Sequence, residues 1–135
     1  MRYLLDTNIC IYIINKSPIG VLKKLNEHKG DEIFISTPSV SELFYGVENS
    51  KQKSENSIKL SIFLTFFENN ILPFDEKSAK EYGKIRAYIN QNNKKQIGDK
   101  DMDIASIAIS NKSILVTNNQ KGFEFIPNLK IENWA

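Results

Sequence analysis

Short apolar runs alternate with longer segments of helical periodicity along this chain. The runs at 3–5, 33–35 and 114–117 are bounded by polar or turn-forming residues, and their length favours buried strands over helices. Between them, apolar residues recur at intervals of three and four, which is typical of amphipathic helices. The predicted helices span about 8–13, 18–26, 38–47, 53–69, 77–91 and 101–110, with short extended runs at 71–74 and 129–131. Short buried strands alternating with helices predict an α/β fold with a mainly parallel sheet.

Two of the predicted helices carry specific expectations. The segment 9–13 is apolar on nearly every face, so we expect it to be buried all round. After the second strand, Thr37 is predicted as a helix N-cap, with Pro38 in the first helical position. The buried stripe of that helix is predicted to be Val40, Leu43, Phe44 and Val47.

The composition limits the chemistry that the chain can perform. At 135 residues, with 41% hydrophobic and 25% charged residues, it fits one globular domain, 1–135. No apolar run reaches the roughly 20 residues of a membrane span, and the N-terminus does not resemble a signal peptide. The one cysteine, Cys10, excludes a disulfide framework and a Cys-rich zinc site, so a cytoplasmic setting is the default. The one histidine, His28, lies in a polar stretch typical of a solvated loop, which leaves catalysis mainly to carboxylates.

The net charge of +2 does not by itself predict a nucleic-acid-binding protein. Basic residues are concentrated between 77 and 100, namely Lys77, Lys80, Lys84, Arg86, Lys94, Lys95 and Lys100. From charge alone, a solvated helix face and loop explain this concentration better than a binding surface does.

Two of the predicted strands end in side chains that carry oxygen atoms. Asp6 follows the first strand, and Asn118 and Asn119 follow the run at 114–117. In open parallel sheets, ligands bind beyond the carboxyl ends of the strands. A carboxylate there is destabilised by desolvation unless a cation neutralises it, whereas Asp is also a good helix cap. For Asp6, position alone favours neither a metal ligand nor a cap.

Two further acidic regions also have both a structural and a functional explanation. Glu42 lies about 200° around its helix from Val40, away from the apolar stripe, which fits a solvated glutamate or one that faces a cleft. Asp99, Asp101 and Asp103 surround a predicted helix start, where acids interact favourably with the helix dipole. Asp101 and Asp103 lie about 200° apart on a helix, so they cannot serve one site equally.

Carboxylates without histidine or cysteine partners suit metal-assisted hydrolysis. Mg²⁺ prefers oxygen ligands and is usually held by one or two carboxylates together with waters and substrate phosphates. Such a metal can activate water and stabilise the leaving oxygen when a phosphodiester is cleaved. A metal-dependent nuclease therefore fits the residues that the chain offers.

Several segments together resemble the PIN-domain family, and within it the VapC-type toxins of bacterial toxin–antitoxin pairs. They are Leu-Asp-Thr-Asn at 5–8, Ser-Glu-Leu-Phe-Tyr-Gly-Val at 41–47, and the segments 97–105, 115–119 and 124–134. Each is a weak signal alone, but together they run from end to end in the family's order. The resemblance implies a three-layer α/β/α sandwich and an Mg²⁺- or Mn²⁺-dependent endoribonuclease acting on RNA, with transfer RNA favoured by analogy. It also implies a homodimer that is neutralised by a cognate VapB-type antitoxin.

The resemblance assigns Asp6, Glu42 and Asp101 as the metal-binding, catalytic acids. Asp101 fits because the family spaces its third acid three residues after the glycine that corresponds to Gly98. The residues expected to support these acids are Thr7, Asn8, Thr117, Asn118 and Asn119. Two positions depart from the family: Asn119 stands where many PIN domains carry a fourth acid, and Ile107 where similar toxins often have histidine. The first departure leaves open whether one metal binds or two.

The resemblance also suggests two contact surfaces. Near the third acid, the candidates for contact with the RNA backbone are Lys94, Lys95 and Lys100, which would make binding salt-dependent. The candidates for a groove that accepts an antitoxin helix are Phe44, Tyr45, Phe63, Phe66 and Phe67. An intramolecular core explains these aromatic residues equally well.

Two other classes of function compete with the nuclease. One is a catalytically weakened PIN module that only binds RNA or an antitoxin, with the change at Asn119 as its cause. The other is a phosphotransferase of the haloacid-dehalogenase type, which also places an Asp after the first strand. That chemistry needs a second acid two residues later, where this chain has Asn8, and is therefore disfavoured.

Overall fold

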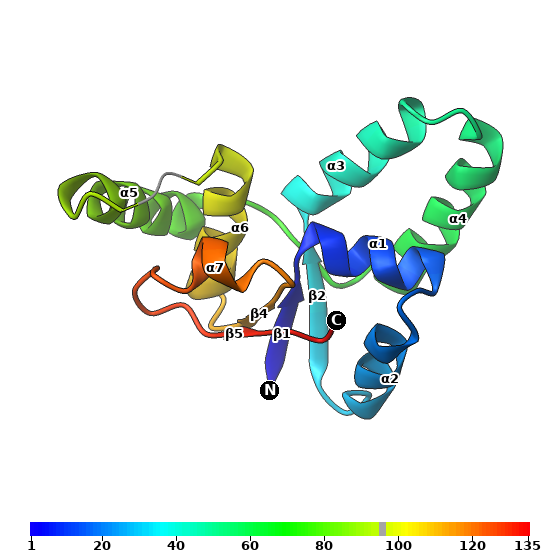
Figure 1. Cartoon of the computed structure of the whole chain (residues 1–135), viewed down its shortest axis with the longest axis horizontal. Coiled ribbons are helices and arrows are strands. Elements are labelled where there is room, and N and C mark those ends of the chain that lie inside the picture. Colours follow the sequence, from blue (N-terminus) through cyan, green and yellow to red (C-terminus); the bar gives the residue numbers. More distant parts are fainter. Residues whose placement is uncertain (95–96) are drawn as a thin grey trace.

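The computed structural model describes residues 1–94 and 97–135, and within these ranges five strands form one parallel sheet (Figure 1). The strands are β1 (Arg2–Leu5), β2 (Glu32–Ser36), β3 (Ile71–Leu72), β4 (Ile114–Val116) and β5 (Ile131–Glu132). They lie in the order β3-β2-β1-β4-β5, and each neighbouring pair is parallel. Leu4 of the central strand pairs with Phe34 of β2 and with Leu115 of β4. The predicted parallel sheet is confirmed.

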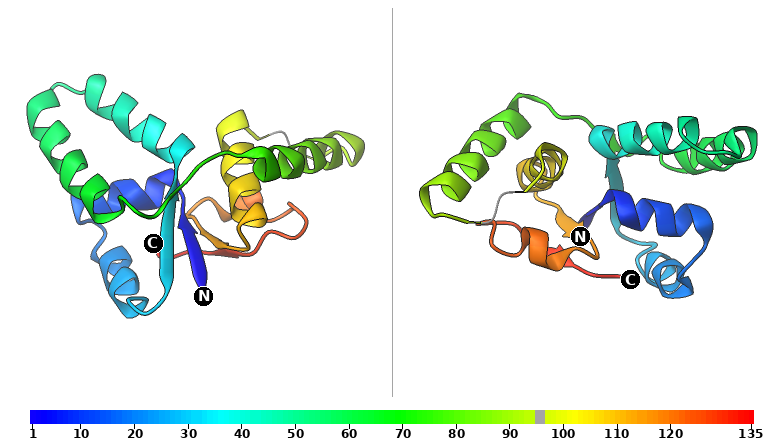
Figure 2. Two further views of the ribbon diagram at one scale, coloured as in Figure 1. Left: turned by 180° about the vertical axis from the view of Figure 1, so that it is seen from behind. Right: turned by 45° about the horizontal axis from the view of Figure 1, so that its top comes forward.

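Helices cover both faces of this sheet. On one face lie α1 (Thr7–Asn15), α2 (Ile19–Glu27), α3 (Thr37–Glu48) and α4 (Lys53–Phe66). On the other lie α5 (Glu76–Gln91), α6 (Asp99–Ser110) and the short α7 (Gln120–Phe123). The views in Figure 2 show the two groups of helices separated by the sheet, which confirms the three-layer α/β/α sandwich.

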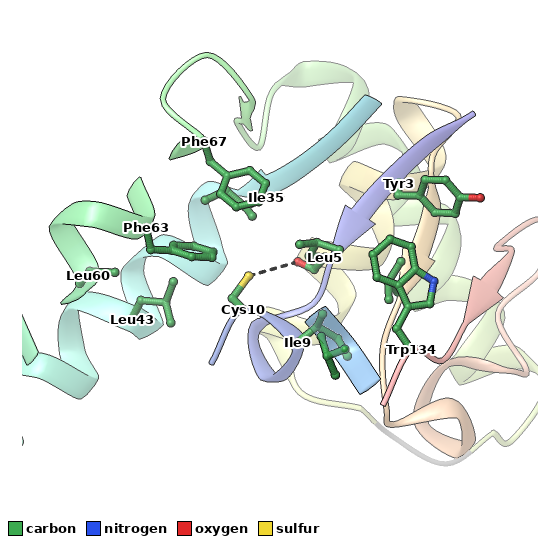
Figure 3. Close-up of a cluster of buried hydrophobic side chains, with 12 residues drawn as sticks. Tyr3, Leu5, Ile9, Cys10, Ile35, Leu43, Leu60, Phe63, Phe67 and Trp134 are labelled. Atoms are coloured by element: carbon green, nitrogen blue, oxygen red, sulfur yellow. Dashed lines mark hydrogen bonds between the residues drawn. The ribbon is translucent and has the colours of Figure 1, made fainter. Parts of the chain in front are cut away.

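Alternation along β1 divides the hydrophobic core in two, because successive side chains of a strand point to opposite faces. Tyr3 and Leu5 pack with α1 to α4, whereas Leu4 packs with α5 to α7. Leu4 and Leu5 are completely buried, and each such side chain stabilises the fold by about 1.5–3 kcal/mol. Figure 3 shows the first core, in which the Cys10 thiol lies 3.9 Å from the Leu5 carbonyl oxygen. Burial raises the pKa of Cys10, so this cysteine has a structural role.

The predicted cap of α3 is wrong by one residue. Ser36 is the N-cap, because its hydroxyl accepts a hydrogen bond from the backbone N–H of Ser39 at 3.3 Å. Thr37 is the first helical residue, and Pro38 follows it. Strand β2 extends to Ser36, which pairs with Leu72 of β3, so the chain enters the helix one residue earlier than expected.

Burial also differs from the periodicity at several positions. Ile11 on α1 is 38% exposed and Phe44 on α3 is 52% exposed, although both were expected to be buried. His28 is not a free loop residue, because it stacks on Trp134 with ring centroids 4.7 Å apart and hydrogen-bonds Asp31. Within the described residues, no helix is long and apolar enough to cross a membrane.

Candidate active site

The carboxyl ends of β1, β2 and β4 bring several polar side chains to one edge of the sheet. Asp6 directly follows β1, Ser36 ends β2 at the start of α3, and Thr117 directly follows β4. Because these three strands are parallel neighbours, the segments that follow them lie side by side at this edge. It is the edge where open parallel sheets bind their ligands.

Asp6 is held by hydrogen bonds to both of its carboxylate oxygens. Oδ1 accepts from the backbone N–H of Thr7 at 2.8 Å, which makes Asp6 the N-cap of α1. Oδ2 accepts from the Thr117 hydroxyl, also at 2.8 Å. The side chain is only 5% exposed, and burial raises its pKa more than these hydrogen bonds lower it. The cap and the candidate ligand are therefore one and the same residue.

Glu42 approaches Asp6 from the second turn of α3. The hydroxyl of Thr7 donates to Glu42 Oε1 at 2.9 Å, so the residue beside Asp6 also fixes the second acid. Glu42 points away from the apolar stripe of α3 and towards the residue that follows β1. This fits the interpretation in which Glu42 faces a cleft. The negative charge of Glu42 contributes to the raised pKa of Asp6.

Asp101 is the third acid of this cluster, in the first turn of α6. Its pKa is raised to about 6, first by burial and then by the charges of Asp6 and Glu42. Asp103 responds to other neighbours: burial and the charge of Asp99 raise its pKa, and Lys100 lowers it. Asp101 therefore responds to the charges of the other two acids, whereas Asp103 responds to Asp99 and Lys100.

The cluster is a set of hard oxygen donors with excess negative charge. Within residues 1–94 and 97–135, no group of three or more acidic, histidine or cysteine side chains already has the geometry to hold a metal ion. Mg²⁺ needs only one or two direct carboxylate ligands and fills its other positions with water. Burial raises the pKa values of Asp6 and Asp101, and the charges of neighbouring acids raise them further. A cation among these carboxylates would favour their ionised forms. The donor set therefore fits a divalent metal held partly through water.

A chain of exposed polar side chains borders the acids. Asn8 donates to Asn118 Oδ1 at 3.3 Å, and Asn118 donates to the Tyr12 hydroxyl at 2.6 Å. Asn119 donates its backbone N–H to the Thr117 hydroxyl at 3.0 Å, while its side chain lies against Gly122. The residue at the place of the fourth acid thus supports Asp6 indirectly, through Thr117.

Sequence reasoning did not identify three residues around this site. They are Tyr12, Ser36 and Ser39. The Ser-Thr-Pro-Ser run at 36–39 was interpreted only as a helix start, although its two serines are completely buried. The sequence did contain a signal for the two serines: Ser36 and Ser39 are three residues apart at a predicted helix start, and the candidate acid Glu42 follows in the same helix.

The candidate contact residues are distributed over several surfaces. Lys94 is exposed after the end of α5, and Lys100 is exposed in the first turn of α6; Lys95 lies outside the described residues. Phe63 and Phe67 belong to the core, whereas Phe66 is 79% exposed. All three nevertheless line a groove of about 530 Å³ whose other apolar walls are Ile13, Ile14, Leu22, Leu25 and Ile62. Phe44 and Tyr45 are exposed on α3, and Phe44 borders a separate hollow between α3 and α4.

Comparison with known proteins identifies the relatives of this chain. The model of the PIN domain family matches residues 3–127. A protein of Rickettsia felis named ribonuclease VapC2 is 46% identical over 135 residues, covering 99% of this chain and 98% of that protein. A tRNA(fMet)-specific endonuclease VapC of Shigella flexneri is 33% identical and covers 100% and 99%. The crystal structure of VapBC2 from Rickettsia felis, bound to a promoter DNA fragment, contains a chain that superimposes with a TM-score of 0.92 at 44% identity, with complete coverage of both chains.

Proposed function

Because this chain belongs to the PIN-domain family and, within it, to the VapC ribonucleases, we propose that it is the toxin of a VapBC-type pair. It acts as an endoribonuclease that hydrolyses RNA phosphodiester bonds. Asp6, Glu42 and Asp101 are its catalytic, metal-binding acids. Thr7, Asn8, Thr117, Asn118 and Asn119 support them, and residues 1–135 act as one domain.

One observation carries the assignment of the site. Asp6 after β1 and the acids of α3 and α6 lie far apart in the sequence, yet their charges act on one another at the carboxyl edge of the sheet. Two of them are held in place by threonine hydroxyls. Three acids placed together repel one another, and a purely structural role would favour separating them. A bound cation would offset the repulsion among these carboxylates, which explains why they lie together.

VapC nucleases with a PIN domain generally depend on a divalent metal, and we propose Mg²⁺, with Mn²⁺ as a substitute. When bound, such an ion lowers the pKa of a coordinated water and offsets the charge that develops on the phosphate. The chain's own task is to hold and orient the ligands. Thr117 and the Thr7 amide orient the Asp6 carboxylate, and the Thr7 hydroxyl orients Glu42.

Transfer RNA is the proposed substrate class. The support is the tRNA(fMet)-specific name of a relative that is 33% identical along the whole chain. Lys94 and Lys100 are exposed near the start of α6, where they can contact phosphates on the strand that enters the site; Lys95 is proposed with them on sequence grounds alone. Such contacts release counterions and make binding salt-dependent.

The proposed antitoxin site is the groove between α1, α2 and α4. Its walls are apolar, and Phe66 offers a large exposed side chain at its border, as an amphipathic partner helix requires. Phe44 and Tyr45 would extend the contact along α3. Crystal structures of VapBC from Rickettsia felis and Salmonella typhimurium contain chains that superimpose on this one with TM-scores of 0.92 and 0.90, which supports an antitoxin as partner. A homodimer remains a prediction from the resemblance, and a cytoplasmic location remains a prediction from the single cysteine.

A cleavage assay with matched variants tests this function. Purified protein is incubated with total transfer RNA, and the products are separated with Mg²⁺ or with EDTA. We expect cleavage only with Mg²⁺, and loss of at least a hundredfold in rate for Asp6→Asn, because the remaining acids cannot place the metal. Asp103→Asn is the control, since Asp103 couples to Asp99 instead of the cluster. No cleavage of any RNA by the unmodified chain, with RNA binding retained, would favour the binding-module alternative.

A further inference from the structure

A row of buried hydroxyl groups leads from the end of β2 to Glu42. Ser36 Oγ donates to Ser39 Oγ at 3.3 Å, and Ser39 Oγ lies 2.9 Å from Thr7 Oγ1. Thr7 Oγ1 in turn donates to Glu42 Oε1 at 2.9 Å. Ser36 and Ser39 are completely buried, and Thr7 is 7% exposed, so water does not compete for these groups.

The direction of every bond in this row follows from the number of protons available. An ionised carboxylate only accepts hydrogen bonds, and each hydroxyl has one proton to give. Thr7 gives its proton to Glu42, so Ser39 must donate to Thr7. Ser36 accepts the backbone N–H of Ser39 and gives its own proton to the Ser39 oxygen. The row therefore points in one direction, from Ser36 to Glu42.

Asp6 is held by the same kind of arrangement. The backbone N–H of Asn119 donates to Thr117 Oγ1, and Thr117 donates to Asp6 Oδ2. In both cases a threonine holds an acid, and the threonine oxygen is itself occupied by another donor. A hydroxyl whose oxygen is occupied has only one direction left for its proton, and it donates more strongly because successive hydrogen bonds polarise one another.

We propose that Ser39 is a positioning residue of the active site, which acts on Glu42 through Thr7 by fixing the direction of the Thr7 hydroxyl. Without Ser39, the buried Thr7 oxygen loses its donor and the hydroxyl can rotate away from Glu42. The consequence is a less ordered second metal ligand. Losing a partner that orients a ligand usually weakens metal binding tenfold to about a hundredfold, and we expect about tenfold because Ser39 acts at one remove.

The proposal rests on the proposed metal site, so its test begins with the metal alone. Binding of Mn²⁺ to the RNA-free protein is followed by electron paramagnetic resonance of the free ion. Ser39→Ala should weaken Mn²⁺ binding about tenfold, and Ser39→Thr, which restores a hydroxyl, should recover most of it. If the unmodified protein binds no Mn²⁺, the metal site itself fails; if it binds and Ser39→Ala binds equally well, only the role of Ser39 fails.

The chain contains a matched control for the structural consequences of removing this hydroxyl. Ser78 is also completely buried and also lies three residues after a helix N-cap, Asp75, whose carboxylate accepts from the Ser78 backbone N–H and hydroxyl. Its hydroxyl likewise reaches a second helix, at Ser110. Ser78→Ala should lower the unfolding temperature while leaving Mn²⁺ affinity within about twofold. Equal weakening of Mn²⁺ binding by both variants would overturn the proposal.

A double-mutant cycle with Thr7→Val separates a positioning role from general loosening of the site. Because Ser39 is proposed to act through the Thr7 hydroxyl, Ser39→Ala should have no further effect on Mn²⁺ affinity once Thr7 is valine. Additive losses would contradict the proposal. Should alanine at position 39 prevent folding, Ser39→Cys fills the space with a weaker donor and is expected to show the same loss of affinity.

Discussion

Replacing Asp101 by asparagine should stabilise the metal-free protein while removing its activity. In the folded chain the pKa of Asp101 is about 6, against 3.8 for the unperturbed group, because of burial and of the charges on Asp6 and Glu42. The folded state therefore holds this proton more tightly than the unfolded state. The free energy of unfolding is therefore highest below pH 3.8, falls as the pH rises towards 6, and reaches its lower limit above that pH.

The magnitude follows from three opposing effects. The difference between the two pKa values corresponds to about 3 kcal/mol of unfavourable free energy above pH 6. Asp101 is only partly buried, so solvent screening reduces this value substantially. Its charge also gains about 0.3–1 kcal/mol from the dipole of α6, which asparagine loses. A net gain of about 1 kcal/mol remains, equivalent to an increase of about 3–5 °C in unfolding temperature for a chain of this length.

Thermal unfolding with EDTA at pH 7.5 and at pH 5 measures this gain. We expect Asp101→Asn to unfold at a higher temperature at pH 7.5. The difference should shrink at pH 5, where Asp101 of the folded protein is mostly protonated but the unfolded group is still ionised. Asp99→Asn is the control, because it lies in the same helical turn and loses the same dipole interaction. Saturating Mg²⁺ should stabilise the unmodified protein and not the variant. A variant that is less stable at pH 7.5, or equally stabilised at both pH values, would refute the repulsion among the acids.

Three further predictions concern residues outside the acid cluster. Lys94→Ala and Lys100→Ala should each lower the slope of RNA affinity against salt by about one, whereas Lys23→Ala on α2 should not; unchanged slopes would exclude phosphate contacts. Phe66→Asp should abolish antitoxin binding and leave RNA cleavage intact, because Phe66 is exposed at the groove, whereas Ile58→Asp, exposed outside the groove on the same helix, should affect binding less. Asp31→Asn should lower the unfolding temperature at pH 7, because the hydrogen bond from His28 and the N-terminal amine lower the pKa of Asp31. The difference from the unmodified protein should shrink as the pH falls below about 3.8. A difference that persists there would contradict this origin.

The sequence was sufficient for the sheet because the sheet depends on local pattern, whereas the acids were grouped into one site only by the family resemblance. Apolar runs too short for helices located β1, β2 and β4, and the residue after such a run is placed at the sheet edge by the fold itself. The pattern therefore places Asp6 at the sheet edge, but it does not decide between a metal ligand and a helix cap. The helical period also gave the direction of Glu42 correctly, since that direction depends only on the spacing from Val40.

Other features depend on contacts that the local pattern does not contain. Ser36 and Thr37 are equally able to cap a helix, and the choice was made by the pairing of Ser36 with Leu72. Helix α4 carries apolar side chains on more than one face, and only the packed structure shows that Phe63 is covered while Phe66 is exposed. The four residues of α7 are too few to show a period.

The central claim is that Asp6, Glu42 and Asp101 hold one divalent metal at the sheet edge. The most direct measurement is a crystal structure of the protein soaked in Mn²⁺, with an anomalous difference map recorded at the manganese edge. The account predicts a peak about 2.1 Å from one or two of these carboxylates, with the third linked through water, and no such peak in Asp101→Asn crystals treated identically. A peak at Asp99 and Asp103 instead, or none at the sheet edge under conditions in which the protein cleaves RNA, would contradict it.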